Sequence, residues 1–265
     1  MKEITSIAEE EYIDDSRKER RRKDRTKRKV KGWVKLLIAL IVLGVIAALL
    51  FAPPFDVKNY EVIGNNYYTD EEIILMGNCK TGENIIIGTD CREIKKRLDR
   101  DAYMQDVKIT RKLPATIKIE LKERKQVGAC VYGPEYIVVD ENGIVLRKAS
   151  IDPKLTIIRG LKISKLVIGE EIEVEETPLL KETLEMLDCM NEHNMYFKEI
   201  QFGNTDIKAY ILDSLVCIGT PDNIMEALET EKLQKVVQSL FDDKIEKGTI
   251  KLSGDNYISF SKKVS

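Results

Sequence analysis

Residues 103–123, YMQDVKITRKLPATIKIELKE, predict a β-hairpin with one face in water and one in a core. Apolar side chains recur at every second position on both sides of the Leu113-Pro114 turn: Val107, Ile109, Ile117, Ile119 and Leu121. Charged or hydroxyl side chains fill the positions between them. A period of two is the spacing of one face of a strand, so both arms are expected to be half-buried strands.

Two short helices and a strand are predicted upstream of this hairpin. Thr69 opens the first helix as its N-cap, and Glu72 completes a capping box. Asp90 opens the second helix, with Glu93 at the third helical position. Residues 55–63, FDVKNYEVI, predict a strand. The order strand, helix, helix, strand, strand indicates two helices packed on a three-stranded sheet.

Further upstream, residues 33–52 form one long apolar run, WVKLLIALIVLGVIAALLFA. A helix of about 20 residues is roughly 30 Å long, which matches the hydrocarbon thickness of a bilayer. The run follows the basic segment 17–31 and precedes Pro53-Pro54, where a helix would stop. The positive charge predicts a cytoplasmic N-terminus and an extracytoplasmic C-terminus. A cleaved signal peptide is disfavoured, because the preceding segment is long and no A-x-A pattern precedes Pro53.

Charge and cysteine content restrict the ligands of the remaining chain. The net charge is −2, and the basic excess is concentrated in the first 35 residues, so the part beyond them is acidic. An acidic part without a basic stripe is not expected to bind nucleic acid.

The five cysteines show no C-x-x-C spacing. They are interpreted as small buried thiols, and the alternatives Cys79–Cys91 or Cys189–Cys217 disulfides stay open.

The region after the first module reads as β-rich with two longer helices. The helices are expected over Thr177–Asn191 and Asp222–Phe241, from apolar residues on one face. An Asp-Glu-Asn-Gly turn predicts a hairpin within Gly133–Leu146. Further short strands are expected at Leu155–Ile158, Tyr196–Phe202, Ile207–Leu212, Leu215–Ile218, Thr249–Leu252 and Tyr257–Phe260.

Catalytic motifs are missing from the sequence. His193 and Cys217 invite comparison with a cysteine transpeptidase of the sortase type, which also needs an arginine after the cysteine. The last arginine is Arg159, and LVCIGT lacks the TLxTC pattern, so this interpretation is rejected. Serine-hydrolase, phosphate-loop and metal-ligand motifs are also missing. We expect no enzyme activity, no cofactor, no metal and no small-molecule substrate.

The motifs in their order resemble a known family. A strand-helix-helix-strand-strand module directly after an N-terminal anchor resembles a POTRA domain. The stretches FDVKNYEVIGN, YTDEEI, GENIIIGTDCREIKKRL, VKITRKLPATIKIELKER and YIVVDENGIVL resemble the FtsQ/DivIB bacterial cell-division proteins. The resemblance covers nearly the whole chain.

The resemblance implies an α+β protein with an N-terminal transmembrane helix, a POTRA domain and a β-rich domain with helices on one face. Its expected parts are a basic cytoplasmic tail (1–32), a transmembrane helix (33–53), the POTRA domain (54–124), the β-domain (125–260) and a short C-terminal stub (261–265).

The resemblance also implies a function. Such a protein is a single-pass scaffold of the plasma membrane at the division septum, which helps control septal peptidoglycan synthesis. Its partners would be small bitopic coiled-coil proteins of the FtsB/DivIC and FtsL types. The matching C-terminal stretch GTIKLSGDNYISF carries the expected interface: Ile250, Leu252, Tyr257, Ile258, Ser259 and Phe260.

The alternative functions are those of a membrane-anchored cell-wall enzyme and of a sensor of the anti-sigma type. An enzyme should show a cleft with converging polar groups, and a scaffold an open sheet edge.

Overall fold

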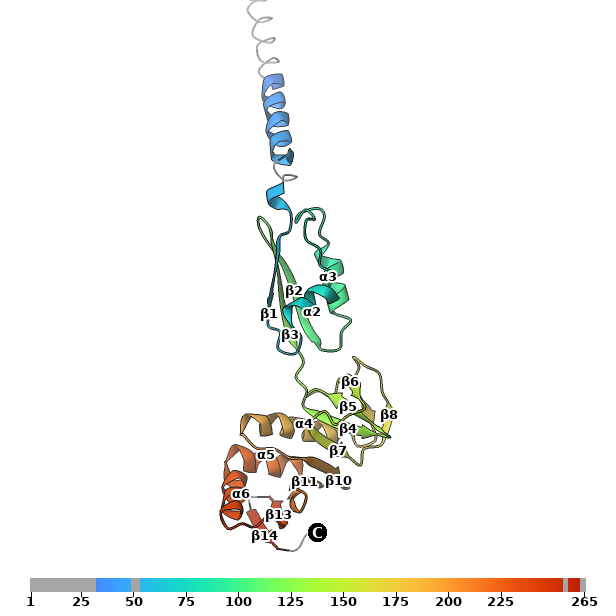
Figure 1. Cartoon of the computed structure of the whole chain (residues 1–265), viewed down its shortest axis with the longest axis vertical. Helices are drawn as coiled ribbons and strands as arrows, with labels where there is room; N and C mark the ends of the chain where they lie inside the picture. Colours follow the sequence, from blue (N-terminus) through green and yellow to red (C-terminus); the bar gives the residue numbers. More distant parts are fainter. Residues whose placement is uncertain (1–31, 49–52, 255–256, 263–265) are drawn as a thin grey trace, which may run out of the picture. The chain divides into compact units, whose positions relative to one another are not determined.

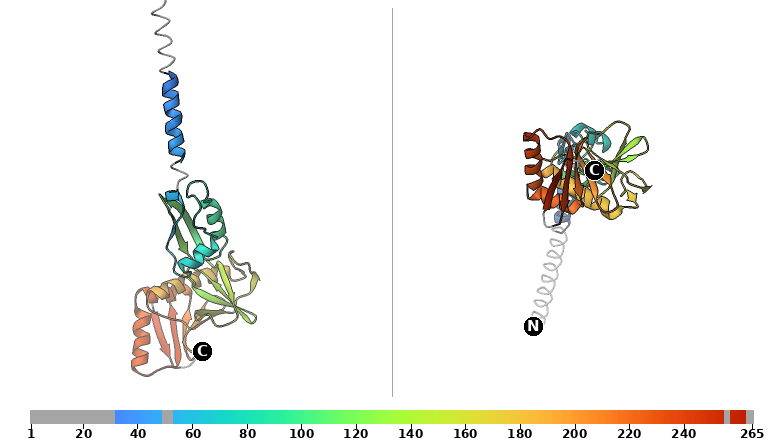
Figure 2. Two further views of the ribbon diagram at one scale, coloured as in Figure 1. Left: turned by 45° about the horizontal axis from the view of Figure 1, so that its top comes forward. Right: turned by 90° about the horizontal axis from the view of Figure 1, so that it is seen from below.

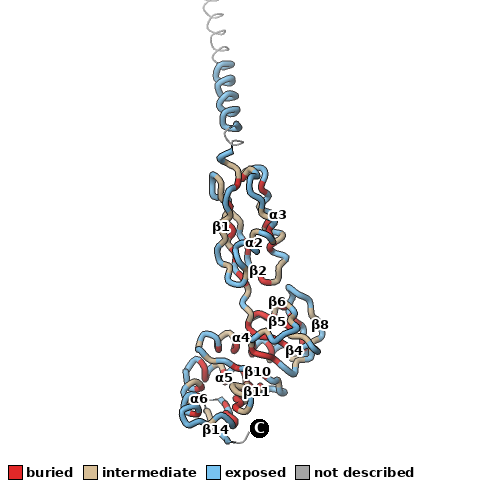
Figure 3. The backbone as a smooth tube through the Cα atoms, in the orientation of Figure 1, coloured by how far each residue is buried: buried red, intermediate tan, exposed pale blue. Residues whose placement is uncertain are grey.

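The computed structural model describes residues 32–48, 53–254 and 257–262 (Figure 1). Most of the predicted basic tail, and residues 263–265 of the predicted stub, lie outside this range. Residues 32–48 are helical, and all their side chains are exposed (Figure 3). This helix covers residues 33–48 of the predicted span 33–53, and residues 49–52 lie outside the described part. In the ranges that the structure describes, no helix is both long and apolar enough to cross a membrane.

The chain divides into two compact units. One joins the helical residues 32–48 to 53–59, 80–89 and 111–117, and the other comprises residues 60–79, 90–110 and 118–265. This division crosses the first module, so the expected domain boundary after residue 124 stays a prediction.

The first module has the predicted order of elements. A 3-10 turn η1 (Pro53–Phe55) is followed by β1 (Asn59–Ile63), α2 (Asp70–Met76), α3 (Cys91–Leu98), β2 (Met104–Lys112) and β3 (Thr116–Glu123). The three strands form one sheet in the order β1-β3-β2. The predicted capping box is present: the Glu72 backbone N–H donates to the Thr69 hydroxyl at 3.3 Å, and the Thr69 N–H donates to the Glu72 carboxylate at 2.8 Å. The predicted Asp90 N-cap also accepts from the N–H groups of Arg92 and Glu93.

A nine-stranded sheet dominates the rest of the chain, in the order β14-β13-β12-β11-β10-β7-β4-β5-β6. Its strands, in chain order, are β4 (Gly128–Tyr132), β5 (Glu135–Val139), β6 (Val145–Ala149), β7 (Thr156–Arg159), β10 (Glu199–Phe202), β11 (Ile207–Leu212), β12 (Leu215–Gly219), β13 (Gly248–Ser253) and β14 (Tyr257–Ser261). Most neighbours are antiparallel, but β7 runs parallel to both β4 and β10, and β13 runs parallel to β12. A separate two-stranded sheet joins β8 (Ile163–Lys165) to β9 (Glu173–Val174).

Three helices pack beside the large sheet: α4 (Thr177–Glu192), α5 (Pro221–Glu229) and α6 (Lys232–Asp242). They form one layer in which α4 contacts α5 and α5 contacts α6 (Figures 1 and 2). Buried residues of all three helices and of strands from β4 to β13 share one hydrophobic core. The α+β fold class and the β-rich domain with helices are therefore confirmed.

The predicted single helix over Asp222–Phe241 is wrong. The chain breaks between α5 and α6, where Glu231 adopts a left-handed backbone conformation with φ 55°. The Thr230 hydroxyl donates to the Glu226 carbonyl at 2.7 Å, so it bonds the last turn of α5. Neither glycine nor proline marks this break. The buried positions Leu233, Val237 and Leu240 of α6 are, however, about half a turn out of phase with Ile224, Ala227 and Leu228 of α5, so one continuous helix could not bury both sets on one face.

Candidate partner-binding edge

The C-terminal strand β14 forms one edge of the nine-stranded sheet. It pairs antiparallel with β13, and in the described part of the chain no other strand pairs with it. The register places Ile250 opposite Phe260 and Leu252 opposite Ile258. An edge strand presents backbone N–H and C=O groups to its open side, where a strand from another chain can pair with it.

One face of this β13–β14 hairpin belongs to the core. Ile250 and Leu252 are 0% and 6% exposed, and they are part of the shared hydrophobic core. Ile258 and Phe260 are half-buried and pack against the same core. The apolar alternation on both strands therefore fixes which way β14 faces, because a slip of one residue would turn these side chains to water.

Gly248 makes room for this packing at the start of β13. Its φ of 146° is favoured by glycine, and a Cβ added there would lie 2.5 Å from the Phe260 ring and 2.6 Å from the Ser261 carbonyl oxygen. A side chain at position 248 would push β14 away from β13. The glycine therefore allows the close approach of the last two strands.

The other face of the hairpin is more accessible at the turn. Tyr257 is 65% exposed and lies opposite Ser253, while the half-buried Ser259 lies opposite the exposed Lys251. By the alternation of a strand, Tyr257 and Ser259 share one face with Lys251 and Ser253. The predicted site did not include Lys251 or Ser253, although the alternation in GTIKLS places both on this face.

The structure thus separates the six predicted interface residues into two groups. Ile250 and Leu252 are core residues of an interior strand and do not reach the open edge. The other four lie on the edge strand itself: Tyr257, Ile258, Ser259 and Phe260.

The cysteine that was compared with a transpeptidase nucleophile is buried. Cys217 is fully buried on β12, and burial raises the pKa of its thiol well above the usual range. Burial likewise raises the pKa of Cys130 to about 12. Both thiols are therefore protonated near neutral pH, whereas a nucleophilic cysteine acts as the thiolate. All five cysteines are free, so neither of the two disulfides considered above is formed.

His193 lines two hollows, and Cys189 lines one of them with it. This second hollow is also lined by acidic side chains of α4 and α5, including Glu185, Asp188 and Glu229. Over the described ranges, no group of three or more His, Cys, Asp or Glu is arranged to hold a metal ion.

The fold and this edge define a class of modular α+β proteins, in which a βααββ module precedes a β-rich domain with an open terminal strand. The family model "POTRA domain, FtsQ-type" matches residues 55–124, which is the βααββ module. The chain is 30% identical over 197 residues to the cell division protein DivIB of Clostridium acetobutylicum, covering 72% of this chain and 78% of that protein. It is 29% identical over 229 residues to DivIB of Clostridium botulinum strain Hall, covering 84% and 86%. It is also 25% identical over 128 residues to the cell division protein FtsQ of Rickettsia bellii, covering 48% and 45%.

The chain belongs to the FtsQ/DivIB family of cell division proteins.

Proposed function

We propose that this protein is a non-enzymatic scaffold of the bacterial division machinery. It holds small bitopic division proteins through its extracytoplasmic domains, and through them it helps control septal peptidoglycan synthesis. Residues 33–53 anchor it in the plasma membrane at the septum, with the N-terminus in the cytoplasm. The family membership, the basic segment 17–31 and the apolar run that follows it support this proposal.

The observation that carries the proposal is the open edge of β14. A partner segment that adds a strand there gains backbone hydrogen bonds along the edge, and pockets for its alternate side chains give specificity. Tyr257 offers an exposed aromatic ring beside the edge, and buried aromatics often carry much of the energy of an interface.

The partners that fit this proposal are coiled-coil proteins of the FtsB/DivIC and FtsL types. Both binding partners would be tethered to one membrane, which raises their effective concentration. A modest intrinsic affinity of the edge is then sufficient for assembly.

The six predicted residues take different roles in this proposal. Tyr257 and Ser259 contact the partner directly, and Ile258 and Phe260 hold β14 against the core while their backbone takes part in pairing. Ile250 and Leu252 support the edge from within the sheet.

The test is binding of the full-length chain in lipid nanodiscs to the extracytoplasmic segments of the partners. Tyr257→Ala is expected to weaken binding by about tenfold, equivalent to about 1.4 kcal/mol. Ser259→Lys is expected to weaken it further, because a lysine on an edge strand opposes strand addition. Tyr132→Ala is the matched control, because it removes a similarly exposed tyrosine from the interior strand β4.

Circular dichroism and thermal unfolding establish that each variant is folded. Folded variants at positions 257 and 259 that bind like the wild type would remove the interface from β14 but keep the scaffold role. A wild-type chain that binds neither partner would contradict the proposed function itself.

A further inference from the structure

Three segments distant in sequence form one face of the first module. They are residues 53–58, 80–89 and 111–117, and we call them together the proximal face. All three belong to the same compact unit as the helical residues 32–48.

Backbone hydrogen bonds join the segments of the proximal face. The Ile85 N–H donates to the Phe55 carbonyl at 2.8 Å, and the Lys58 N–H donates to the Ala115 carbonyl at 2.8 Å. These bonds connect 53–58 to each of the other two segments. The proximal face is therefore one continuous structure and not three separate loops.

Arg111 makes the third connection. Its guanidinium donates to the Ile85 carbonyl at 2.6 Å and to the Thr89 carbonyl at 2.9 Å. Inside the loop, the Asn84 side chain accepts from the Ile86 N–H at 3.0 Å. The loop 80–89 is thus fixed from both sides, and the orientation of its side chains is set by the fold.

The proximal face exposes apolar side chains that the module does not bury. Ile87 is 63% exposed and Leu113 is 59% exposed. Each lies two residues from a position that is hydrogen-bonded into the face, Ile85 and Ala115 respectively. Pro53 and Pro54 add two further exposed apolar rings.

Basic side chains accompany these apolar groups. The three segments contain Lys58, Lys80, Arg111 and Lys112 against Asp56 and Glu83, and the three lysines are exposed. The chain beyond the apolar run is acidic in total, so this positive excess is local. Exposed apolar side chains mixed with lysines are typical of surfaces that lie in the interface of a membrane.

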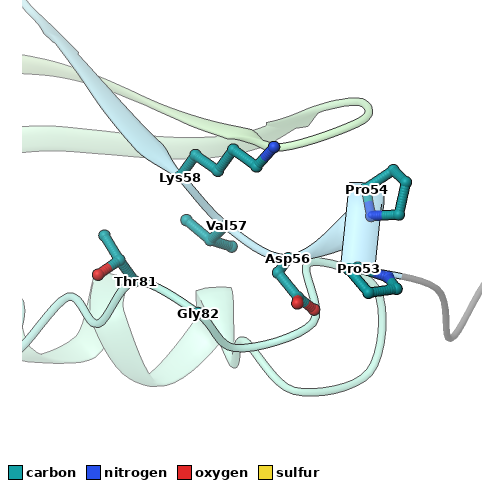
Figure 4. A pocket seen from close by; sticks show the side chains of 7 residues that line it. All are labelled: Pro53, Pro54, Asp56, Val57, Lys58, Thr81 and Gly82. Carbon is teal, nitrogen blue, oxygen red and sulfur yellow. The ribbon is translucent and has the colours of Figure 1, made fainter.

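A shallow hollow lies on the same face. It is lined by Pro53, Pro54, Asp56, Val57, Lys58, Thr81 and Gly82. Figure 4 shows the two proline rings at one side, Thr81 at the other and the Lys58 side chain extending beside them. Its lining combines the two proline rings with the Lys58 ammonium, the Thr81 hydroxyl and the Asp56 carboxylate. Because Asp56 would repel a phosphate inside the hollow, the phosphate contacts are expected from the exposed lysines around it.

The covalent chain limits how far the proximal face can be from a bilayer that holds the apolar run. From residue 48 to Pro53 the chain makes five Cα steps, which reach at most about 18 Å. The polar headgroup region itself occupies several ångströms on each side of the hydrocarbon core. The proximal face is therefore within reach of the headgroups.

We propose that the proximal face binds the outer surface of an anionic phospholipid bilayer, with Ile87 and Leu113 inserted at the headgroup boundary and Lys58, Lys80 and Lys112 on lipid phosphates. This inference rests on the proposed membrane anchor. It adds a second membrane contact, which would restrict the tilt of the first module. A lipid occupant is favoured over a protein because the chain connection alone brings this face to the membrane.

The test uses tryptophan fluorescence of the full-length chain in vesicles of phosphatidylcholine and phosphatidylglycerol that contain lipids brominated near the headgroup. Trp33 is the only tryptophan of the chain, so its quenching in the wild type reports insertion of the anchor. In a Trp33→Phe background, Ile87→Trp and Leu113→Trp each report the proximal face. Ile151→Trp is the control, because Ile151 is 82% exposed and lies outside the three segments.

We expect strong quenching for Ile87→Trp and Leu113→Trp, little for Ile151→Trp, and weaker quenching of the first two in phosphatidylcholine alone. If Trp33 is quenched in the wild type but Ile87→Trp and Leu113→Trp are quenched no more than Ile151→Trp, the inference is overturned and the membrane anchor stands. Unquenched Trp33 would overturn both. Equal quenching with and without phosphatidylglycerol would overturn the role of the lysines. The two reporter sites are independent, so a folding defect in one leaves the other to decide.

Discussion

The two edges of the nine-stranded sheet are protected to very different degrees. At β6, a loop pairs with the first residue of the strand: the Val145 N–H donates to the Glu170 carbonyl at 2.9 Å, and the Gly169 N–H donates to the Val145 carbonyl at 2.8 Å. The same strand also carries two basic side chains, Arg147 and Lys148. At the opposite edge, β14 has the sequence YISFS, without a charge.

The difference between the two edges indicates at which of them a partner strand can bind. Open strand edges promote unwanted pairing, and proteins usually cover or charge them. The chain applies both devices at β6 and neither within β14. The proposed partner-binding site therefore lies at the edge that the chain leaves unprotected.

The largest expected effect comes from breaking the protected edge. Asp140 is fully buried, accepts from the Ile144 N–H at 2.7 Å, and pairs with the Arg124 guanidinium at 2.9 Å. Asp140→Ala would leave Arg124 without its carboxylate and loosen the β5–β6 turn. We expect a loss of roughly 2–4 kcal/mol in the free energy of unfolding, measured by urea denaturation.

The matched control for this variant is Asp213→Ala, which removes an exposed ion pair with Lys198 and should cost at most about 1 kcal/mol. Equal losses in the two variants would show that the buried pair does not hold the β6 edge. Partner binding at β14 should be retained by whatever fraction of Asp140→Ala remains folded.

A smaller effect is expected at the open edge from Gly248→Ala. The added Cβ would meet the Phe260 ring, so β14 must shift, at a cost of roughly 1–3 kcal/mol. Because β14 would be displaced from β13, partner binding should fall more than global stability does. Thermal unfolding and nanodisc binding assays measure the two quantities separately.

Gly254→Ala serves as the comparison, since nothing lies within 4 Å of a Cβ added there. If Gly248→Ala bound partners as well as Gly254→Ala does, the close packing of β14 on β13 would not matter for recognition.

The sequence predicts best those elements whose signal is local. The capping box of Thr69 and Glu72 and the alternation from Val107 to Leu121 depend on neighbours a few residues apart, and both are present in the structure. The strand β14 is also located by its own alternation. Its position at the sheet edge was expected from the family resemblance and not from the residues alone.

Other features are harder to predict. The left-handed Glu231 that separates α5 from α6 has no glycine or proline beside it, so the sequence marks this break through the half-turn shift of the buried apolar positions between the two helices. No prediction covers β4, where the small residues Gly128, Ala129 and Cys130 lie in the middle of the sheet and pack from both sides. The burial of Ile250 and Leu252 follows from the register between β13 and its neighbours, which the sequence of one strand does not fix.

Hydrogen exchange of the full-length chain in nanodiscs, with and without the FtsB/DivIC-type partner, tests whether β14 is the partner-binding edge. The backbone amides of residues 257–261 are expected to exchange more slowly when the partner is bound, because some of them become donors to its strand. The amides of β6, residues 145–149, should not change. Protection of β6 without protection of β14 would contradict partner binding at β14.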